Sequence, residues 1–252
     1  MRSFEVIFED NEIIVVYKPA MMATQTAGLG RSDLVSELKN YLAGKNIAGN
    51  RSGREPYLGV IHRLDQPVEG LLVFAKTKTA AAELSRQNAE RSKQAMQKIY
   101  YAVVSGVPDN REGELRGLIG QDKWTNRSFI IEGRPIPNEI NPREAHLFYR
   151  MMDHKAPDDR SQEGITLMEI RLGTGRHHQI RVQMAHARMP LLGDNRYGNE
   201  RSKEQSKHFN CRQIALCAGR LKLRHPVSGL QQEFTAQPHN EIFKVFSTFF
   251  SS

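Results

Sequence analysis

The sequence predicts an α+β fold in which a large, mostly antiparallel sheet is flanked by helices and loops. Three observations favour it. Short apolar runs of strand length outnumber segments with helical periodicity, the two kinds do not alternate strictly, and turn residues separate neighbouring runs. The 252 residues contain no repeat, no low-complexity tract and no clear linker. We therefore expect a single domain over residues 1–252, with its core at about 4–240.

The first third of the chain predicts four strands and one helix. Strands are expected at 4–8, 12–17, 57–64 and 71–77, and a helix at 32–43. Ser32 is a candidate cap for that helix, whose leucines recur every four residues. The turn QPVEG separates the third and fourth strands. Strand alternation then places Arg63 and Asp65 on one face and His62 on the other.

The remainder predicts a further set of strands and helices. Strands are expected at 98–106, 144–152, 165–172, within 212–226, and at 230–238; helices are expected at 79–93, 175–187 and 243–250. In the helix at 175–187, Ile180, Met184 and Ala187 should face inward. The polar connection at 153–164 is expected to be exposed and mobile.

Composition narrows the class of protein. A net charge of +8 and a pI of about 9.6 favour a polyanionic partner, with nucleic acid the first to consider. Cys211 and Cys217 have no zinc-ligand spacing, so they are expected to be reduced thiols. No signal peptide or membrane-spanning run is visible. We expect a cytoplasmic protein.

Asp65 is the first candidate reagent, because an ionised carboxylate can serve as a nucleophile or a base. In a partly buried cleft it stays ionised only near a cation. Arginine suits that purpose because it keeps its charge, and Arg63, Arg176 and Arg181 lie in suggestive stretches. The alternative from the residues alone is a turn aspartate with a surface ion pair.

Other chemistries are less well supported by the residues. Asp65 and Glu69 could form the carboxylate pair of a glycosidase, but their separation in space does not follow from the sequence. His177, His178 and His186 lack the spacing of a metal site. The chain also has no phosphate-binding loop and no nucleophile elbow.

Six blocks of the chain, in order, resemble those of the RluA-type pseudouridine synthases. One block is HRLDQPVEGLLVFAK at 62–76. The others are VVYKPA at 15–20, KIYYAVVSG at 98–106, REAHLFYRMM at 143–152, GTGRHHQIRVQMAHARMPLLGDNRYG at 173–198 and RLKLRHPVSG at 220–229. The sequence departs from the family pattern at Val68–Glu69 and at Leu147. The resemblance starts near residue 4, so no S4-like RNA-binding domain is expected.

The resemblance implies an RNA pseudouridine synthase, an isomerase that converts uridine in rRNA or tRNA to pseudouridine without a cofactor or metal. Asp65 matches the family's essential catalytic aspartate. Arg181 matches the arginine that pairs with this aspartate. Tyr100 matches the tyrosine that stacks on the uracil and is a candidate for the proton step at C5.

Four further residues are implied to bind the substrate. Arg63 matches the arginine that enters the RNA stack where the uridine leaves it, offsetting part of the cost of flipping the base. Ile180 is expected to pack beside the base, and His62 and Arg176 to lie in the same site.

The expected partner is a structured stem-loop of rRNA or tRNA, with no membrane and no obligatory protein partner. A monomer is expected. Two alternatives stay open: an inactive RNA-binding protein with the same fold, and the glycosidase that uses Asp65 and Glu69.

Overall fold

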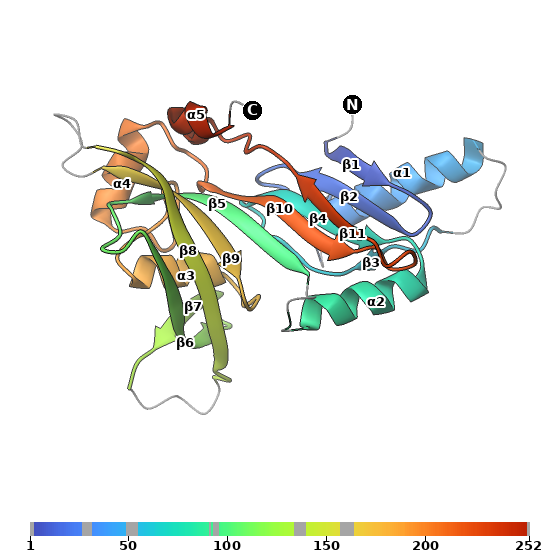
Figure 1. Ribbon diagram of the computed structural model, residues 1–252, viewed down its shortest axis with the longest axis horizontal. Helices are drawn as coiled ribbons and strands as arrows, with labels where there is room; N and C mark the ends of the chain where they lie inside the picture. The colour runs from blue at the N-terminus through green and yellow to red at the C-terminus, as the bar shows by residue number, and fades with distance from the viewer. Residues whose placement is uncertain are drawn as a thin grey trace. The chain divides into compact units, whose positions relative to one another are not determined.

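The computed structural model describes residues 3–26, 32–48, 55–90, 92, 96–133, 140–156 and 164–250 (Figure 1). The chain folds into two compact units, Met1–Lys98 with Ala218–Gln237 and Ile99–Cys217 with Pro238–Ser252. The described residues contain eleven strands and five α-helices, which confirms the predicted α+β class. Each unit is built from two separate stretches of sequence. The expected single domain stays a prediction.

The first unit has strands in the order β1–β2–β4–β10, with β3 on β4 and β11 on β10. The strands are β1 (Glu5–Glu9), β2 (Ile13–Lys18), β3 (Gly59–Val60), β4 (Glu69–Ala75), β10 (Leu216–Arg224) and β11 (Gln231–Thr235). The helices α1 (Leu34–Ala48) and α2 (Lys78–Ala89) lie beside these strands (Figure 1). The pairs β1–β2, β2–β4 and β10–β11 are antiparallel.

The core of this unit is centred on β2 and β4, because every residue of both strands is buried. Ile13 and Val15 pack with Val73 of β4 and with Leu221 and Leu223 of β10. Continuous apolar runs of this kind are typical of strands covered on both faces. The site region is therefore carried by the most buried strands of the unit.

Several expected boundaries in this unit were wrong. The strand expected at 57–64 forms ladder pairs only at 59–60, and β4 already begins at Glu69, inside the expected turn. Helix α1 runs on to Ala48, and its first turn is capped by Asp33 rather than Ser32: the Asp33 carboxylate accepts the N–H of Ser36 at 2.8 Å.

The second unit has strands in the order β5–β9–β8–β6–β7. They are β5 (Gln97–Ser105), β6 (Glu112–Asp122), β7 (Arg127–Ile131), β8 (Arg143–Lys155) and β9 (Ile165–Leu172), and all their described pairings are antiparallel. The helices are α3 (Gln179–His186), α4 (Glu200–His208), the 3₁₀ helix η1 (Glu241–Phe246) and α5 (Ser247–Phe250). Unit boundaries fall within β5 and β10.

The paired strands β8 and β9 confirm the sequence prediction, whereas β6, β7 and α4 were not anticipated. Helix α3 starts only at Gln179 and is buried on nearly all sides, so it is not the amphipathic helix expected at 175–187. Ile180 and Met184 are buried as expected, and Ala187 follows the helix end. The expected mobile connection is partly strand, since β8 continues to Lys155; residues 157–163 lie outside the described residues.

None of the helices in the described ranges combines the length and the apolar character needed to cross a membrane. Cys211 and Cys217 are both buried, and neither forms a disulfide within the described residues. The segment 243–250 is helical, but its first half is a 3₁₀ helix in which Phe243 and Phe246 are buried.

Candidate active site

Asp65 lies in the first unit, in the turn that joins β3 to β4. Its carbonyl accepts a hydrogen bond from the N–H of Val68 at 3.0 Å, which closes the turn, and its side chain is half-buried. Residues 61–66 belong to no strand, so the alternation that placed Arg63 and Asp65 on one face does not apply. Arg63 is exposed and makes no ion pair or hydrogen bond with any residue that the structure describes.

The backbone on each side of Asp65 is fixed by a side chain from the last residue of β2 or from the segment that follows it. The Thr24 hydroxyl donates to the Leu64 carbonyl at 3.0 Å and accepts from the Leu64 N–H at 3.2 Å. The ammonium group of Lys18 donates to the carbonyl of Gln66 at 3.1 Å. These contacts hold the residues before and after Asp65, which is the kind of support that a precisely placed carboxylate requires.

Lys18 is fully buried at the end of β2, and its charge is satisfied by carbonyl groups. Besides Gln66, it donates to Met22 at 2.7 Å and to Pro19 at 3.0 Å. Burial lowers the pKa of Lys18 to about 8, and the carboxylates of Asp65 and Glu69 oppose that shift. Lys18 is therefore a buried cation whose field acts on both carboxylates.

His62 faces β4, where its ring nitrogen Nε2 accepts from the N–H of Val73 at 3.4 Å. Its Nδ1 is inaccessible to solvent and has no hydrogen-bond partner among the described residues. Burial lowers the pKa of His62 to about 3, with a further contribution from Lys98. The imidazole is therefore neutral at physiological pH, and its role in binding the substrate stays a prediction.

Arg181 lies in the second unit, in the first turn of α3, and is buried. Its Nε donates to one oxygen of Asp194 and its Nη2 to the other, both at 2.8 Å. The Asp194 side chain is completely buried and also accepts the backbone N–H of Arg196 at 3.0 Å and of Tyr197 at 3.2 Å. The predicted pairing of Arg181 with Asp65 stays a prediction.

Electrostatics keep Asp194 ionised. Burial alone would raise its pKa, but the hydrogen bonds and charge of Arg181, together with the N–H groups of Arg196 and Tyr197, outweigh burial and lower it. The two hydrogen bonds to Asp194 thus fix the orientation of the guanidinium group, and Nη1 takes no part in them. Arg181 is a rigid donor whose net charge Asp194 largely compensates.

A second layer of contacts surrounds this pair. The ring centre of Tyr197 lies 5.1 Å from the guanidinium carbon of Arg181. The Tyr197 hydroxyl accepts the N–H of Ser128 at 2.8 Å and lies 2.8 Å from Nδ1 of His178. Burial lowers the pKa of His178 to about 3, with Arg181 adding to the effect, so this ring is neutral as well.

The remaining predicted site residues also belong to the second unit. Tyr100 is nearly buried in β5, opposite Ile170 of β9, and Ile180 is buried in α3 beside Arg181. Arg176 precedes α3 and donates its Nε to the Glu144 carbonyl at 2.9 Å. Arg176, Ile180 and Arg181 therefore lie on one continuous stretch around the start of α3.

Two residues of this arrangement were missed from the sequence. A signal for Lys18 existed, because a lysine at the end of an otherwise apolar strand is expected to be either exposed or fully hydrogen-bonded. The only sequence feature that pointed to Asp194 was its place in the motif block at 173–198. Its distance from Arg181 in the sequence, 13 residues, gave no indication of a bidentate pair.

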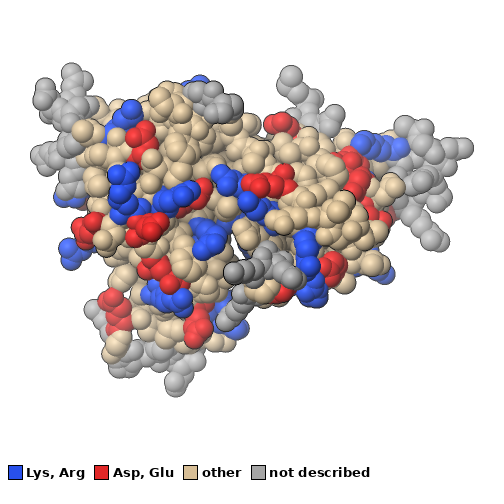
Figure 2. Space-filling view, viewed as in Figure 1, with Lys and Arg blue, Asp and Glu red and all other residues tan. Residues whose placement is uncertain are grey.

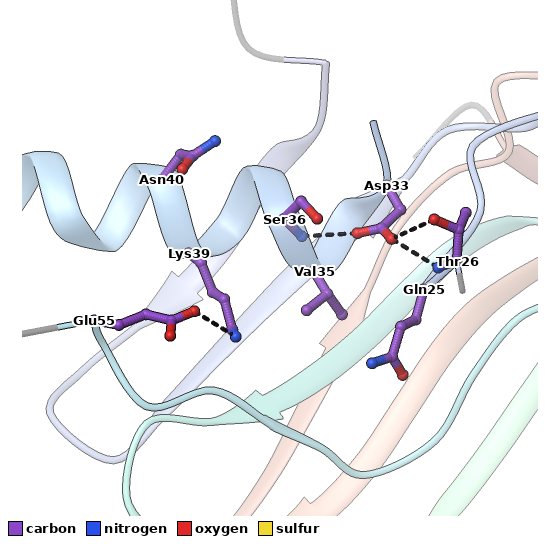
Figure 3. Close-up of a pocket in the computed structure, with 8 residues that line it drawn as sticks. All are labelled: Gln25, Thr26, Asp33, Val35, Ser36, Lys39, Asn40 and Glu55. Atoms are coloured by element: carbon purple, nitrogen blue, oxygen red, sulfur yellow. Dashed lines mark hydrogen bonds and ion pairs between the residues drawn. The ribbon is translucent and has the colours of Figure 1, made fainter. Parts of the chain in front are cut away.

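The described residues contain no group of three histidine, cysteine, aspartate or glutamate side chains that could hold a metal ion. A polar cavity of about 340 Å³ lies beside α1 in the first unit (Figure 3). Asp33 there caps the helix and Lys39 pairs with Glu55 at 2.7 Å, so its charged groups are already engaged. No predicted site residue lines it. On the face seen in Figure 2, basic and acidic side chains are interspersed.

Comparison with known proteins gives a consistent picture. The family model described as RNA pseudouridylate synthase matches residues 12–186. The chain is 32% identical to "Ribosomal large subunit pseudouridine synthase D" of Neisseria meningitidis serogroup B, over 97% of this chain and 61% of that protein. The protein of the same name from Zymomonas mobilis is also 32% identical, with 96% and 71% covered.

A third relative, "tRNA pseudouridine synthase C" of Pectobacterium carotovorum, is 31% identical over 89% of this chain and 56% of its own length. The chain thus spans 56–71% of the length of these three relatives. Among solved structures, "Human RNA Pseudouridylate Synthase Domain Containing 4" is similar with a TM-score of 0.70, 20% identity and coverage of 97% and 92%. "Human RNA Pseudouridylate Synthase Domain Containing 1" is also similar, with a TM-score of 0.69 and 21% identity, over 93% of this chain and 83% of that chain. At these identities the structural likeness establishes the fold.

Proposed function

The chain belongs to the RNA pseudouridylate synthase family, and we propose on that premise that it isomerises uridine to pseudouridine in rRNA or tRNA. In this reaction the bond from uracil N1 to ribose C1′ breaks and a bond from C5 to C1′ forms. The proton at C5 is lost and N1 gains one. The relatives named for the large ribosomal subunit and for tRNA support both classes of RNA as substrates.

The observation that carries the proposal is the position of Asp65 within the matched region, in a turn fixed on both sides. Thr24 holds Leu64 and Lys18 holds Gln66, so the backbone that carries this carboxylate is held in place without substrate. We assign Asp65 as the catalytic aspartate, acting at the ribose C1′ or C2′ of the target uridine.

The other assignments complete the proposal. Tyr100 stacks on the uracil and takes part in the proton step at C5, and Arg181 orients the aspartate. Arg63 fills the place of the flipped base, which its exposure and lack of described partners support. His62, Ile180 and Arg176 contact the substrate around these groups.

The protein is proposed to act as a monomer in the cytoplasm, without an obligatory protein partner. Purified protein alone should therefore turn over its RNA. If the purified chain is inactive on every rRNA and tRNA offered, the result would favour the first alternative, an RNA-binding protein that has the fold but no activity. The glycosidase alternative has no support from the family match, and Glu69 is buried at the start of β4.

Tritium release from RNA labelled at C5 of uridine tests the assignment of Asp65. Asp65→Asn keeps the shape of the side chain but removes its charge and basicity, so isomerisation should fall by several orders of magnitude while RNA binding persists. Asp109→Asn, at an exposed aspartate of another turn, is the matched control and should retain full activity. A rate for Asp65→Asn within about tenfold of the unmodified protein, a barrier change of only about 1.4 kcal/mol, would refute the assignment.

A further inference from the structure

The hairpin of β6 and β7 ends in a turn that carries an almost fully exposed tryptophan. Asp122 pairs with Arg127 at the end of the ladder, which leaves residues 123–126 as the turn. Trp124 within it is 95% exposed and is the only tryptophan in the chain. Indole rings are among the largest apolar groups that proteins bury, so folding alone gives no reason for this exposure.

The turn keeps its shape without help from the indole. The Asp122 carboxylate accepts the N–H of Trp124 at 2.8 Å and the hydroxyl of Thr125 at 2.7 Å. Asn126 adopts the left-handed conformation, with φ of 51°, and its carbonyl accepts a hydrogen bond from Arg196. The backbone is thus held by other groups, and the ring is displayed on a rigid support.

Cationic residues flank the tryptophan in the sequence, and apolar side chains lie on one face of the hairpin. Lys123 precedes it and Arg127 follows the turn, and both are exposed; the Arg127 guanidinium also donates to the Arg196 carbonyl. Leu118 and Phe129 share the outer face of the hairpin and are 38% and 36% exposed. The one acidic group in the turn, Asp122, is occupied by hydrogen bonds within it. A flat apolar ring between cations matches an unpaired nucleobase with its phosphates.

We propose that the tip of the β6–β7 hairpin, residues 122–127, binds single-stranded RNA by stacking one unpaired base on Trp124, with Lys123 and Arg127 at the adjoining phosphates. The choice of RNA as the partner rests on the proposed function; the stacking site itself rests on the hairpin. It adds a recognition element at residues to which the isomerisation gives no role.

The hairpin tip is connected to Arg181 by an unbroken series of contacts inside the second unit. Arg196 donates from its side chain to the Asn126 carbonyl and from its backbone N–H to Asp194. Asp194 in turn holds Arg181 through two hydrogen bonds. A base stacked on Trp124 would therefore be bound by the same structural block as the arginine of the proposed active site.

The single tryptophan allows a direct test on the unmodified sequence. Its fluorescence should be strongly quenched by a stem-loop RNA with an unpaired loop, because stacking brings a base against the indole. Heparin, a polyanion without bases, should bind through the same cations without comparable quenching. Equal quenching by RNA and heparin, or no quenching at RNA concentrations that saturate binding, would overturn the proposal.

Variants then measure the contribution to affinity. Trp124→Ala should weaken binding of the stem-loop on the order of tenfold, within the usual range for one base stacked on an aromatic ring. Trp124→Phe keeps a flat ring and should recover most of the affinity. Leu230→Ala removes another exposed apolar side chain, at 68% exposure, and should leave binding unchanged. Unchanged affinity in Trp124→Ala would contradict the stacking site.

Failure of this proposal can be told apart from failure of the proposed function. Quenching and affinity are measured with Asp65→Asn as well as with the unmodified chain, so they do not depend on turnover. Tritium release without quenching leaves the isomerase and removes the stacking site. Quenching by RNA without tritium release keeps the stacking site and refutes the isomerase.

Discussion

The bidentate pairing of Arg181 with Asp194 determines what a substitution of either residue should do. Arg181→Met leaves a buried carboxylate without its cation, which costs about 3–5 kcal/mol in buried pairs of this kind. The pKa of Asp194 should then rise, because burial favours the neutral acid. Any kinetic study of Arg181 therefore needs a stability measurement beside it.

Arg63 and Arg181 should respond differently to the structure of the RNA. Arg63→Ala removes an exposed cation that is proposed to replace the flipped base, so its defect should shrink when the target uridine is already unstacked. Arg181→Met should remain equally defective on both RNAs, since its partner is a carboxylate of the protein. Single-turnover rates on a tight stem-loop and on a loosened version of it provide the measurement.

The double variant Arg181→Met/Asp194→Asn is the control, because it removes the unpaired buried charge and restores much of the stability. If Arg63→Ala and Arg181→Met recover by the same factor on the loosened RNA, the two arginines do not have the separate roles assigned to them.

Because the pKa of Lys18 is lowered in the folded state, we expect stability and activity to change in opposite directions at alkaline pH. In the folded state the pKa of Lys18 is about 8, whereas the unfolded chain keeps this proton up to about 10.5. Between these values the unfolded state binds more protons, so the contribution of Lys18 to stability rises with pH. A neutral amine has two N–H groups for three carbonyls, so the turn at Asp65 should loosen and the rate should fall above about pH 8.

The measurement is the pH dependence of the single-turnover rate and of urea unfolding. Lys18→Met should lose the alkaline fall in rate and only part of the rise in stability, because burial also lowers the pKa of Lys98 to about 8 and Lys98 contributes a rise of its own. Lys98→Met is the matched control, and it should lose a similar part of the rise in stability but keep the fall in rate. If the alkaline fall in rate disappears in Lys98→Met and persists in Lys18→Met, then Lys98 causes it and the prediction for Lys18 is wrong.

At the scale of elements, Gly70 sets how closely β4 and β10 can approach. Its φ is +124°, and a Cβ built there would lie 2.5 Å from the backbone N and O of Ala218. Gly70→Ala should therefore destabilise the protein by about 3 kcal/mol or more, through both strain and overlap. Gly44 in α1 has open space around it, so Gly44→Ala should stabilise by about 0.5–1 kcal/mol.

Urea unfolding of both variants checks this contrast, because the two substitutions add the same methyl group. A loss for Gly70→Ala no larger than about 0.5 kcal/mol would mean that the two strands can separate at little cost.

The elements that the sequence predicted are those whose own residues decide them. The hairpin β1–β2, helix α2 and the pair β8–β9 carry apolar periodicity or clear turn residues, and all are present. Strand β6 was missed because glycines and charged residues alternate along it, and only its partners β7 and β8 complete its hydrogen bonds. Helix α4 was missed because it is polar throughout and so has no apolar periodicity, although Asn199 caps it.

The same distinction, between residues that local sequence identifies and residues that only the fold identifies, applies to the candidate site. Asp65, Tyr100 and Arg181 could be nominated from motif blocks, because those blocks are local in sequence. The partners Lys18 and Asp194 depend on which carbonyl or carboxylate the fold brings near, and local periodicity contains no such information. Side-chain geometry of this kind requires the three-dimensional structure.

At the scale of the whole molecule, the net charge of +8 and the lack of a metal-ligand group in the described ranges lead to one prediction. Isomerisation should continue in excess EDTA, provided that the RNA is folded in monovalent salt, and RNA affinity should fall steeply as that salt rises. Tritium release with and without the chelator is the measurement. Activity that is lost on chelation and restored by a divalent ion, with the RNA still folded, would contradict a metal-free reaction.

The discontinuous make-up of the two units has a consequence for synthesis on the ribosome. The core of the first unit needs Leu221 and Leu223, which emerge long after Ile13 and Val73 have been made. At 5–20 residues per second, the stretch between the two halves takes about 6–24 s to translate. The second unit likewise waits for Phe243 and Phe246. The nascent polypeptide therefore exposes apolar strands until these later residues have been made, which makes it a candidate client for chaperones that protect unfinished chains.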